Sequence, residues 1–413
     1  MAHVLVAGAG IVGVSTAIWL QRAGHDVTLV DRDGPAAGTS HGNAGVLAAG
    51  ALIPVTTPGL LRKVPGMLLN RDAPLFLRWS YLPRLLPFLR SYLRHANKDH
   101  VQHYAQNMIH LLGDSLAQHK ALAEGTGAER FVHDDDYCFG YASEAAFDAD
   151  GVAWALRKTH GVRFDVMPGP DYAARDPLFD GAFHKVVVCK NHGRISDPGA
   201  YVRALAEHFE KEGGQIHLTT IQDIEMEGPH CKALITEDGR MKADHIVLTL
   251  GPWSAPLARK MGARNLSFES ERGYHIELTN PSAMPAAPMM VAAGKFVITP
   301  MEGRIRCGGV IEFGGLEASA SRAPLEMLKR QVAQLLPDVT YDDVVEWMGH
   351  RPAPADSLPL IGATDPDGQG YLAFGHQHVG LTGGPKTGRI IADLISDRPP
   401  NMHLAPFDPK RPM

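Results

Sequence analysis

Residues 3–31 alternate between two short apolar runs and one helical pattern. The runs are "HVLVA" at 3–7 and "VTLV" at 27–30, and apolar residues recur at helical spacing between them. Short apolar runs bounded by glycine predict buried strands, whereas a period near 3.6 residues predicts a helix. The segment therefore predicts a complete strand–helix–strand unit that ends at Asp31.

Two later segments repeat this pattern. The first is a helix from Pro198 to about Glu212, capped by Asp197 and followed by strands in "QIHLTT" and "DHIVLTLG". The second is a strand "YLAF", a glycine-rich loop over 375–384 and an apolar helix starting near Lys386. A helix N-terminus and a lysine at this point would favour negative charge on a nearby ring system. We expect both segments to extend the sheet of the first unit.

Composition narrows the class of ligand. The 413-residue chain is 45% hydrophobic and 21% charged, enough to bury the cores of two or three domains. Its net charge of -5 gives no general attraction for nucleic acid, so small-molecule ligands are favoured. The four cysteines lie too far apart for a zinc motif, and we expect free thiols in a reducing, cytoplasmic compartment. Neither a signal peptide nor a membrane-spanning run is expected.

Gly8, Gly10 and Gly13 form a GxGxxG motif between the first strand and its helix. These positions allow a tight turn, a close approach of the backbone to a pyrophosphate, and close packing of the helix on the strand. Asp31 lies where a carboxylate accepts hydrogen bonds from a ribose and disfavours a 2'-phosphate. The motif predicts a dinucleotide site that disfavours NADP and leaves NAD and FAD open.

The stretch "GPAAGTSHGNAGVLAAGALIP" at 34–54 favours FAD. An NAD-binding domain usually continues with a second run of strand–helix–strand units, and none directly follows Asp31. Glycine and other small residues instead let the backbone lie flat against a planar ring system, with its N–H groups available to ring atoms. The alternative is a flexible surface loop without a ligand.

Motifs along nearly the whole chain resemble the FAD-dependent D-amino-acid dehydrogenases, within the D-amino-acid oxidase-like amine oxidoreductases. They are, in order, residues 4–33, "GTSHGNAG", "GRISDPGAYVRAL", "IVLTLGPWS", "RGYHIEL", "HRPAPADSLPLIG" and "GHQHVGLTGGPKTGRIIADLI". The resemblance implies an α/β fold with a discontinuous Rossmann-like FAD-binding domain and a second α+β substrate domain built on a mixed, mostly antiparallel sheet. We expect the first domain over 1–60, 193–256 and 346–413, and the second over 61–192 and 257–345.

The resemblance also implies a reaction. It is the oxidative deamination of a D-amino acid or a cyclic D-imino acid, such as D-proline or hydroxy-D-proline, by hydride transfer from Cα to flavin N5. The imino acid then hydrolyses to a 2-oxo acid and ammonia, and electrons pass to a quinone or the respiratory chain. Two alternatives stay open: a glycine- or sarcosine-type oxidase that uses oxygen, and a non-catalytic flavin-binding subunit of an amine dehydrogenase complex.

Three residues are candidates for contact with the reacting groups. Arg351 matches the family arginine that clamps the substrate carboxylate, because a planar guanidinium binds a carboxylate in a bidentate way. The alternative for Arg351 is an ion pair with Asp356 or a cofactor phosphate. In "RGYHIEL" the alternation aims Tyr274 and His275 at opposite faces of a strand, and we expect Tyr274 to face the substrate. The third candidate is His376.

The motifs also predict the residues that bind FAD, which we expect to be non-covalent. His41 raises the alternative of a covalent attachment found in some relatives, but the pattern around it differs. His376 and His378 have an HxH spacing, yet no third ligand group accompanies them, so no metal is expected. The expected FAD-binding residues are Gly8, Gly10, Ile11, Val12, Gly13, Asp31, Arg32, Thr39, Ser40, His41, Asn43, Ala44, Gly45, Gly251, Trp253, Gly375, His378, Val379, Gly380, Leu381 and Thr382.

The segment 73–98 bears on the electron acceptor. It contains five basic residues and no acidic one, interleaved with leucine and aromatic residues. Such a stretch suits a membrane interface, so peripheral association with the inner face of the cytoplasmic membrane is one interpretation, and packed covering helices are the other. Pro83 and Pro87 predict short helices here rather than one.

Overall fold

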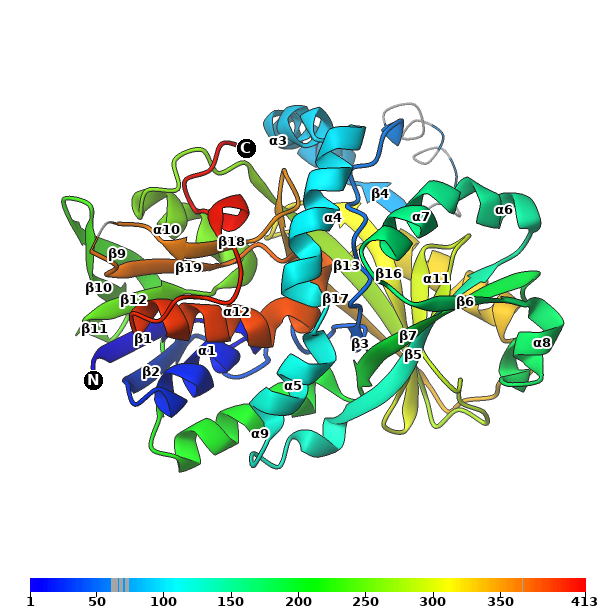
Figure 1. Cartoon of the computed structure of the whole chain (residues 1–413), viewed down its shortest axis with the longest axis horizontal. Coiled ribbons are helices and arrows are strands. Elements are labelled where there is room, and N and C mark those ends of the chain that lie inside the picture. The colour runs from blue at the N-terminus through cyan, green and yellow to red at the C-terminus, as the bar shows by residue number, and fades with distance from the viewer. Residues whose placement is uncertain (61–65, 67–69, 71–73, 366) are drawn as a thin grey trace.

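The computed structural model of the chain describes residues 1–60, 66, 70, 74–365 and 367–413 (Figure 1). The expected domain boundary at residue 61 and the first residue of the basic segment, residue 73, lie outside the described residues. Two large sheets stand side by side in Figure 1, with the N-terminus on the smaller one. The cysteines Cys138, Cys189, Cys231 and Cys307 are buried free thiols.

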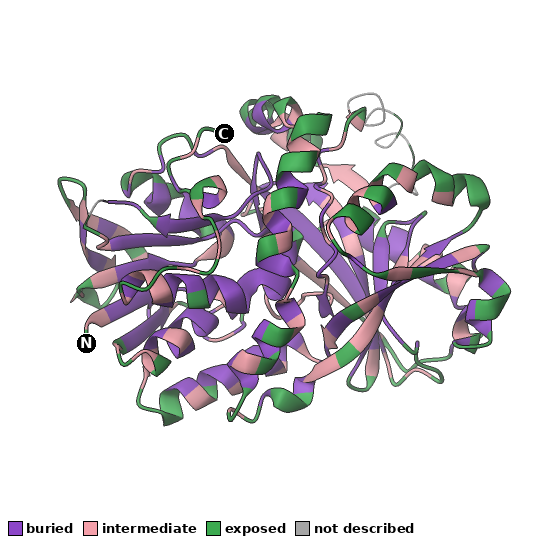
Figure 2. Cartoon of the chain, in the orientation of Figure 1, coloured by how far each residue is buried: buried purple, intermediate pink, exposed green. Residues whose placement is uncertain are grey.

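The smaller sheet confirms the strand–helix–strand unit. It has the order β18-β19-β12-β1-β2-β8, in which β18 is antiparallel to β19 and the other neighbours are parallel. Helices that pack on this sheet bury an apolar core around Val6, Val14 and Leu29 (Figure 2). The unit and the other strands of this sheet are β1 His3–Ala7, α1 Ile11–Arg22, β2 Asp26–Asp31, β8 Gln215–Leu218, β12 His245–Leu248, β18 Leu360–Ala363 and β19 Gly370–Phe374.

The helix expected after Asp197 is α9, Pro198–Lys211, and the Asp197 side chain accepts a hydrogen bond from the Ala200 N–H at 2.9 Å. The C-terminal helix, in contrast, does not start near Lys386. It is α12, Gly380–Ile395, so the second half of the expected glycine loop, residues 380–384, is helical. Lys386 is buried, and its Nζ lies 3.0 Å from both carboxylate oxygens of Asp114. The lysine charge is therefore paired with Asp114.

Glycine in α12 serves close packing rather than loop formation. A Cβ atom on Gly388 would lie 2.6 Å from the Ser15 and Thr16 backbone of α1, and one on Gly384 would lie 3.1 Å from Ile11. The two helices therefore approach more closely than side chains would permit. The packing of α12 on α1 outweighs the low helix propensity of glycine. That low propensity is why the sequence pattern predicted a loop here.

The larger sheet is mixed and mostly antiparallel, as expected. Its path is β17-β13-β16-β15-β14-β5-β7-β3, with β4 on β16 and β6 on β7. Among the described residues of this sheet, the β14–β5 and β16–β4 pairs are parallel and the other pairs are antiparallel. These strands are β3 Val46–Leu47, β4 Leu75–Leu77, β5 Val132–Tyr141, β6 Phe164–Pro168, β7 Lys185–Ile195, β13 Phe268–Thr279, β14 Met289–Val291, β15 Phe296–Met301, β16 Arg304–Phe313 and β17 Val344–Pro354.

The expected boundary at residue 346 falls inside β17, which pairs with β13 from Val344 to Pro354. Likewise β3 and the end of β7 belong to the larger sheet although both were expected in the first domain. We therefore propose that the chain leaves the substrate domain after residue 354. A third, three-stranded sheet consists of β9 Ile221–Glu227, β10 His230–Thr236 and β11 Gly239–Lys242.

The two prolines of the basic segment do not divide it into short helices, although the strand β4 and the 3-10 helix η1 precede α3. Helix α3, Leu82–Arg94, contains both prolines, because Pro83 lies in the first turn, where no N–H partner is needed, and Pro87 removes a single bond. Its Leu85, Phe88 and Tyr92 pack on the ends of β16 and β17. In the described ranges no helix combines the length and apolar composition needed to cross a membrane.

The remaining helices and short turns surround the two large sheets, and α4 lies across the junction between them in Figure 1. These elements are η1 Trp79–Tyr81, α4 Lys98–Leu112, α5 Ser115–Ala123, η2 Glu129–Phe131, α6 Glu144–Ala149, α7 Gly151–Thr159, α8 Gly169–Ala173, η3 Pro177–Phe179, η4 Gly251–Trp253, α10 Ser254–Lys260, α11 Arg322–Leu335, η5 Gln377–Val379 and η6 Ala405–Phe407.

A buried arginine joins the larger sheet to the glycine-rich segment. Arg306 on β16 is 1% exposed, and its Nη1 donates to the His41 carbonyl at 3.0 Å and to the Asn43 carbonyl. Its Nε donates to Glu277 on β13 at 2.7 Å. Burial raises the pKa of Glu277, but the charges of Arg306 and Arg304 outweigh that effect and hold the pKa below its ordinary value. The pair therefore stays ionised.

Replacing Glu277 with glutamine should destabilise the fold strongly, because it leaves the buried Arg306 charge uncompensated. We expect a loss of about 3–5 kcal/mol of unfolding free energy, measured by urea denaturation of the FAD-free protein. Glu225→Gln, which breaks the exposed pair with Arg240, is the control and should leave the midpoint almost unchanged. Equal midpoints for the two variants would contradict a structural role for the Arg306–Glu277 pair.

Candidate active site

A cavity of about 390 Å³ lies where the parallel strands of the smaller sheet end. Its lining comes from the turn after β1, the end of β2, the turn after β12 and the turn after β19. Because these carboxyl ends meet at one edge of the sheet, four separate parts of the sequence contribute to one site. This is where open α/β sheets bind their ligands.

The glycine motif has the geometry that a dinucleotide site requires. Gly8 has a φ of +108°, a conformation that other residues rarely adopt. A Cβ atom on Gly13 would lie 1.8 Å from the Gly8 carbonyl oxygen, so only glycine permits α1 to begin so close to β1. Gly8, Gly10, Ile11 and Val12 line the cavity where α1 begins, and the N-terminus of a helix favours a phosphate group.

Asp31 lines the same cavity, and its carboxylate is held in a fixed orientation. Oδ2 accepts from the Ala9 N–H at 2.7 Å, and Oδ1 accepts from Asp33 N–H at 2.9 Å and Gly34 N–H at 3.0 Å. The two oxygens have about four lone-pair sites between them. Oδ1 already accepts two hydrogen bonds, so Oδ2 is the oxygen that retains capacity for a ribose hydroxyl.

The glycine-rich segment passes from this cavity to the larger sheet. Ser40 Oγ accepts from the Ile11 N–H at 2.9 Å, and Thr39 Oγ1 donates to the His350 carbonyl at 2.6 Å. Further along, Thr382 Oγ1 accepts from the Ala48 N–H at 3.2 Å. The segment is thus fixed at both ends and is not the flexible loop that was the alternative.

Most of the expected cofactor residues line the cavity. Several residues that no sequence motif predicted also line it. The expected residues that do not line it are Gly13, His41, Ala44, Gly45, His378, Val379 and Thr382, which lie at the start of α1, along the glycine-rich segment and in η5 and α12. Unexpected lining includes Thr220, Ile221 and Gln222, which the crossing from β8 to β9 brings there. The expected lining residues are Gly8, Gly10, Ile11, Val12, Asp31, Arg32, Thr39, Ser40, Asn43, Gly251, Trp253, Gly375, Gly380 and Leu381.

Arg351 lies on the face of β17 that turns toward the glycine-rich segment. A Cβ atom on its neighbour Gly273 would lie 2.6 Å from Arg351 Nη2 and 2.7 Å from Cζ, so the guanidinium packs flat against the bare glycine. In the antiparallel pair of β13 with β17, Gly273 lies directly opposite Gly349. A Cβ atom on Gly349 would lie 2.0 Å from Trp347 Cη2, so the Trp347 ring covers Gly349 as the Arg351 guanidinium covers Gly273.

The Arg351 guanidinium has no ion pair and no hydrogen bond in the part of the chain that the structure describes. The expected alternative partner Asp356 binds Arg411 instead, at 2.7 Å. Burial lowers the pKa of Arg351, and the nearby negative charge of Glu271 opposes this. A half-buried guanidinium without a partner is a site for a planar anion.

The two histidines of the HxH motif lie in different surroundings. His376 lines the cofactor cavity, and its Nε2 is 2.9 Å from Thr387 Oγ1. His378 is solvent-exposed and does not line that cavity. Desolvation, and then the nearby Arg351 charge, lower its pKa to about 4. Among the described residues, no group of three or more His, Cys, Asp or Glu side chains could hold a metal ion.

The choice of Tyr274 over His275 is reversed by the sheet. Tyr274 lies on the opposite face from Arg351, where its hydroxyl donates to Glu312 at 2.5 Å and accepts from the Ser321 N–H at 3.0 Å. His275 is on the Arg351 face and stacks on Trp347 with 4.9 Å between ring centroids. Alternation predicted two faces, but it carried no information on which one meets the site.

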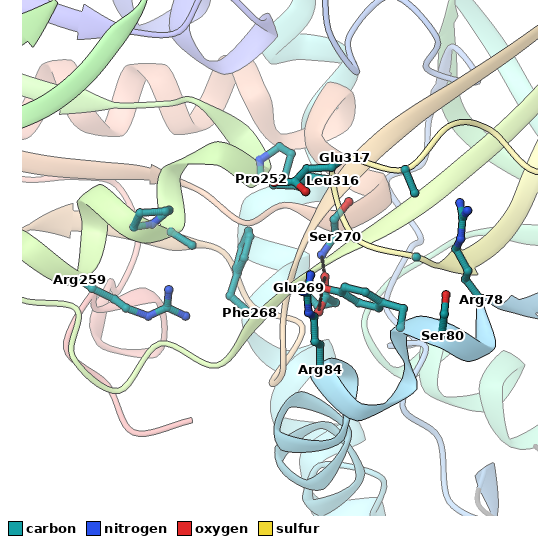
Figure 3. Close-up of a pocket in the computed structure, with 16 residues that line it drawn as sticks. Arg78, Ser80, Arg84, Pro252, Arg259, Phe268, Glu269, Ser270, Leu316 and Glu317 are labelled. Atoms are coloured by element: carbon teal, nitrogen blue, oxygen red, sulfur yellow. Dashed lines mark hydrogen bonds between the residues drawn. The ribbon is translucent and has the colours of Figure 1, made fainter.

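A second hollow, of about 640 Å³, adjoins the cofactor cavity (Figure 3). Pro252 and Pro256 line both spaces. On its other side the Tyr81 hydroxyl donates to both oxygens of Glu269, at 3.0 and 3.1 Å. The exposed Arg78 and Arg84 stand at its rim. The hollow therefore opens between α3, α10 and the first residues of β13.

Comparison with known proteins agrees with this geometry. The family of FAD dependent oxidoreductases that includes the D-amino-acid oxidases matches residues 3–394. The chain belongs to this family. This FAD-dependent oxidoreductase is 36% identical to a D-amino-acid oxidase of Bradyrhizobium diazoefficiens, over 99% of this chain and 98% of that protein. It is 31% identical to a D-amino acid dehydrogenase of Rhizobium rhizogenes, over 95% of each.

Solved structures show the same fold. Glycine oxidase from Geobacillus kaustophilus superposes with a TM-score of 0.77 at 21% identity and covers 100% of both chains. L-proline dehydrogenase from P. horikoshii gives 0.73 at 16% identity, over 99% of this chain and 97% of that one. At these identities the likeness establishes the architecture of this oxidoreductase and leaves its substrate to be argued from the site.

The residues of the oxidoreductase fit FAD. The glycine turn admits a pyrophosphate at the start of α1, Asp31 offers acceptors for a ribose, and the fixed glycine-rich segment continues from there toward Arg351. His41, the residue considered for covalent attachment, lies over Gly199 at the start of α9.

Replacing Gly273 with alanine should displace the Arg351 guanidinium, because the new methyl group occupies its position. We expect FAD to be retained and the Kd of a carboxylate ligand to rise about 30-fold or more, equivalent to about 2 kcal/mol. The measurement is a titration followed by flavin absorbance. Gly151→Ala, whose added Cβ meets nothing within 4 Å, is the control. Unchanged affinity in Gly273→Ala would show that the guanidinium is not the anion site.

Proposed function

We propose that this FAD-dependent oxidoreductase oxidises free D-amino acids, including cyclic D-imino acids such as D-proline, to imino acids. The observation that carries the proposal is the Arg351 guanidinium, which has no partner in the described part of the chain and lies on a glycine floor beside the cofactor site. The phosphates and the ribose of FAD have their own partners at the start of α1 and at Asp31. The anion left for Arg351 is then the carboxylate of the substrate.

The chain positions the substrate. Arg351, which lies flat against Gly273, holds the carboxylate in a bidentate grip and so fixes the position of the Cα atom. The Trp347 ring, which covers Gly349 and stacks on His275, closes one side of the site. His378 stays neutral at working pH, because burial keeps its pKa near 4, so it does not compete with Arg351 for the carboxylate.

Bound FAD supplies the acceptor for two electrons in the form of a hydride. On the substrate, the Cα–H bond breaks with its electron pair while the lone pair of the neutral amine forms the C=N bond. Where the substrate is a primary amine, water then adds to the imino carbon and ammonia leaves as the 2-oxo acid forms. The nitrogen of a cyclic substrate stays attached through the ring, so no ammonia is released. Positioning by the clamp accounts for much of the rate, and no dedicated base is needed for this route.

The D configuration is supported by relatives and not by geometry. The curated relatives at 36% and 31% identity are named for D-amino acids. The solved structures of the same fold include a glycine oxidase and an L-proline dehydrogenase, so the architecture accommodates either hand. Substrate handedness therefore has to be measured.

Arg351→Ala should keep FAD and lose reduction of the flavin by substrate. We expect kcat/KM for anaerobic reduction to fall about 30- to 5,000-fold, which corresponds to about 2–5 kcal/mol of transition-state binding. The measurement is bleaching of flavin absorbance by D-alanine, D-proline, hydroxy-D-proline and their L isomers, with glycine and sarcosine alongside. Exposed Arg264→Ala is the control.

Each outcome of this panel decides between functions. Reduction by D isomers supports the proposal, and preference for glycine or sarcosine would make the protein an oxidase of that type. A flavin that no amine reduces would indicate a non-catalytic subunit. Full activity in Arg351→Ala would reject the clamp.

We also propose that the electrons pass to a quinone at a membrane surface. The exposed side of η1 and α3 carries Trp79 and Leu86, which are 65% and 55% exposed, among four exposed arginines. Arginines with apolar neighbours suit the surface of an anionic membrane. The four arginines are Arg78, Arg84, Arg90 and Arg94.

Reversing two of these charges tests the membrane part of this proposal. Arg84→Glu with Arg90→Glu should abolish sedimentation with phosphatidylglycerol vesicles, whereas Lys158→Glu with Lys211→Glu, an equal change on α7 and α9, should not. Vesicles of phosphatidylcholine should bind neither form. Faster turnover with oxygen than with a soluble quinone analogue would contradict the quinone as acceptor.

A further inference from the structure

Glu271 is a buried carboxylate next to the anion site. It is 1% exposed and lies directly opposite Arg351 in the antiparallel pair of β13 with β17, so both side chains leave the same face of the sheet. Its Oε1 accepts from the Tyr92 hydroxyl at 3.3 Å. Its Oε2 is buried and has no hydrogen-bond partner among the described residues.

Arg351 and Glu271 face each other without forming an ion pair. The guanidinium lies over Gly273, which is two residues after Glu271 on β13. It therefore points away from the Glu271 carboxylate. Among the described residues no acidic oxygen is within 4.0 Å of it. Because Glu271 is almost fully covered whereas Arg351 is half-buried, a ligand can reach the guanidinium and not the carboxylate.

The groups around Glu271 determine when it carries charge. From β17 the Arg351 charge favours the ionised form, and from α3 the Tyr92 hydroxyl donates to it. Burial and the neighbouring Glu269 on β13 favour the protonated form, and burial is the larger effect, so the pKa of Glu271 is raised. Tyr104 on α4 lies behind Tyr92 and is itself neutral, because burial raises its pKa.

We infer that Glu271 is a positioning residue for Arg351. The Glu271 carboxylate serves as the counter-charge of Arg351 in the empty site, and Glu271 takes up a proton when a carboxylate ligand binds to the guanidinium. The inference rests on the proposed binding of the substrate carboxylate at Arg351. The carboxylate of a bound ligand adds a second negative charge beside Glu271. Among the described residues that act on Glu271, Arg351 is the cation, so no further positive charge balances the ligand. Protonation restores neutrality of the buried cluster.

A definite pH dependence follows from this coupling. Between the pKa of Glu271 in the empty site and its higher pKa in the occupied site, binding takes up one proton. The Kd of a carboxylate should therefore rise with pH through that window, by up to about tenfold per pH unit. Below the window Glu271 is protonated in both states, and the Kd should be constant.

The experiment titrates the FAD-loaded protein with propanoate, a carboxylate without an amine, so that the ligand itself does not titrate between pH 6 and 9. Flavin absorbance gives the Kd at each pH from 5 to 9, calculated for the propanoate anion because part of the ligand is protonated near pH 5. Wild type should bind more weakly as the pH rises. Glu271→Gln should bind with the low-pH affinity of wild type at every pH. Glu269→Gln and His378→Asn, which alter neighbouring titratable groups, should retain a slope.

Calorimetry of wild type in buffers of different ionisation enthalpy gives the proton count directly, even if Glu271→Gln does not fold. Uptake approaching one proton per bound propanoate within the window supports the inference. A wild-type Kd that is constant from pH 5 to 9, an unchanged slope in Glu271→Gln, or a binding event without proton uptake across that range would overturn it. If propanoate binds equally well to Arg351→Ala, the proposed clamp fails instead.

Discussion

The Arg306 guanidinium is the contact on which the geometry of the site depends. One buried side chain holds the carbonyls of His41 and Asn43 and is neutralised by Glu277 on the adjacent strand. It thereby fixes the distance between the glycine-rich segment and the sheet that carries Arg351. A buried charge can persist only where such partners surround it, so the position of the segment is specified as tightly as the ion pair itself.

Glycines allow close contacts both at the cofactor cavity and beside Arg351. At Gly13 the absence of a side chain lets a helix begin against a strand, and at Gly273 it lets a guanidinium lie flat on a strand. Neither position needs an unusual backbone angle in the way that Gly8 does. The fold therefore uses the lack of a Cβ atom to bring charged or polar groups within reach of a ligand.

Local patterns in the sequence were sufficient for the first strand–helix–strand unit and for the place of Asp31 at the end of β2, because both depend on residues close together in the chain. Alternation is identical for either face of a strand, so only pairing with β17 shows that Tyr274 lies on the face away from Arg351. The start of α12 was misplaced because packing on α1 outweighs glycine propensity. Glu271, Tyr92 and Thr220 carried no motif, and only the tertiary fold brings them to the site.

The smaller sheet also constrains how the protein can be made. Strand β1 pairs with β12, and β12 pairs with β19, so residues 3–7 have no complete sheet until residues 370–374 exist. During translation the ribosome must release nearly the whole chain before the nucleotide cavity can close. The β1–α1 unit has to wait, with apolar surface exposed, for partners synthesised much later. Loading with FAD is then a late event in biogenesis.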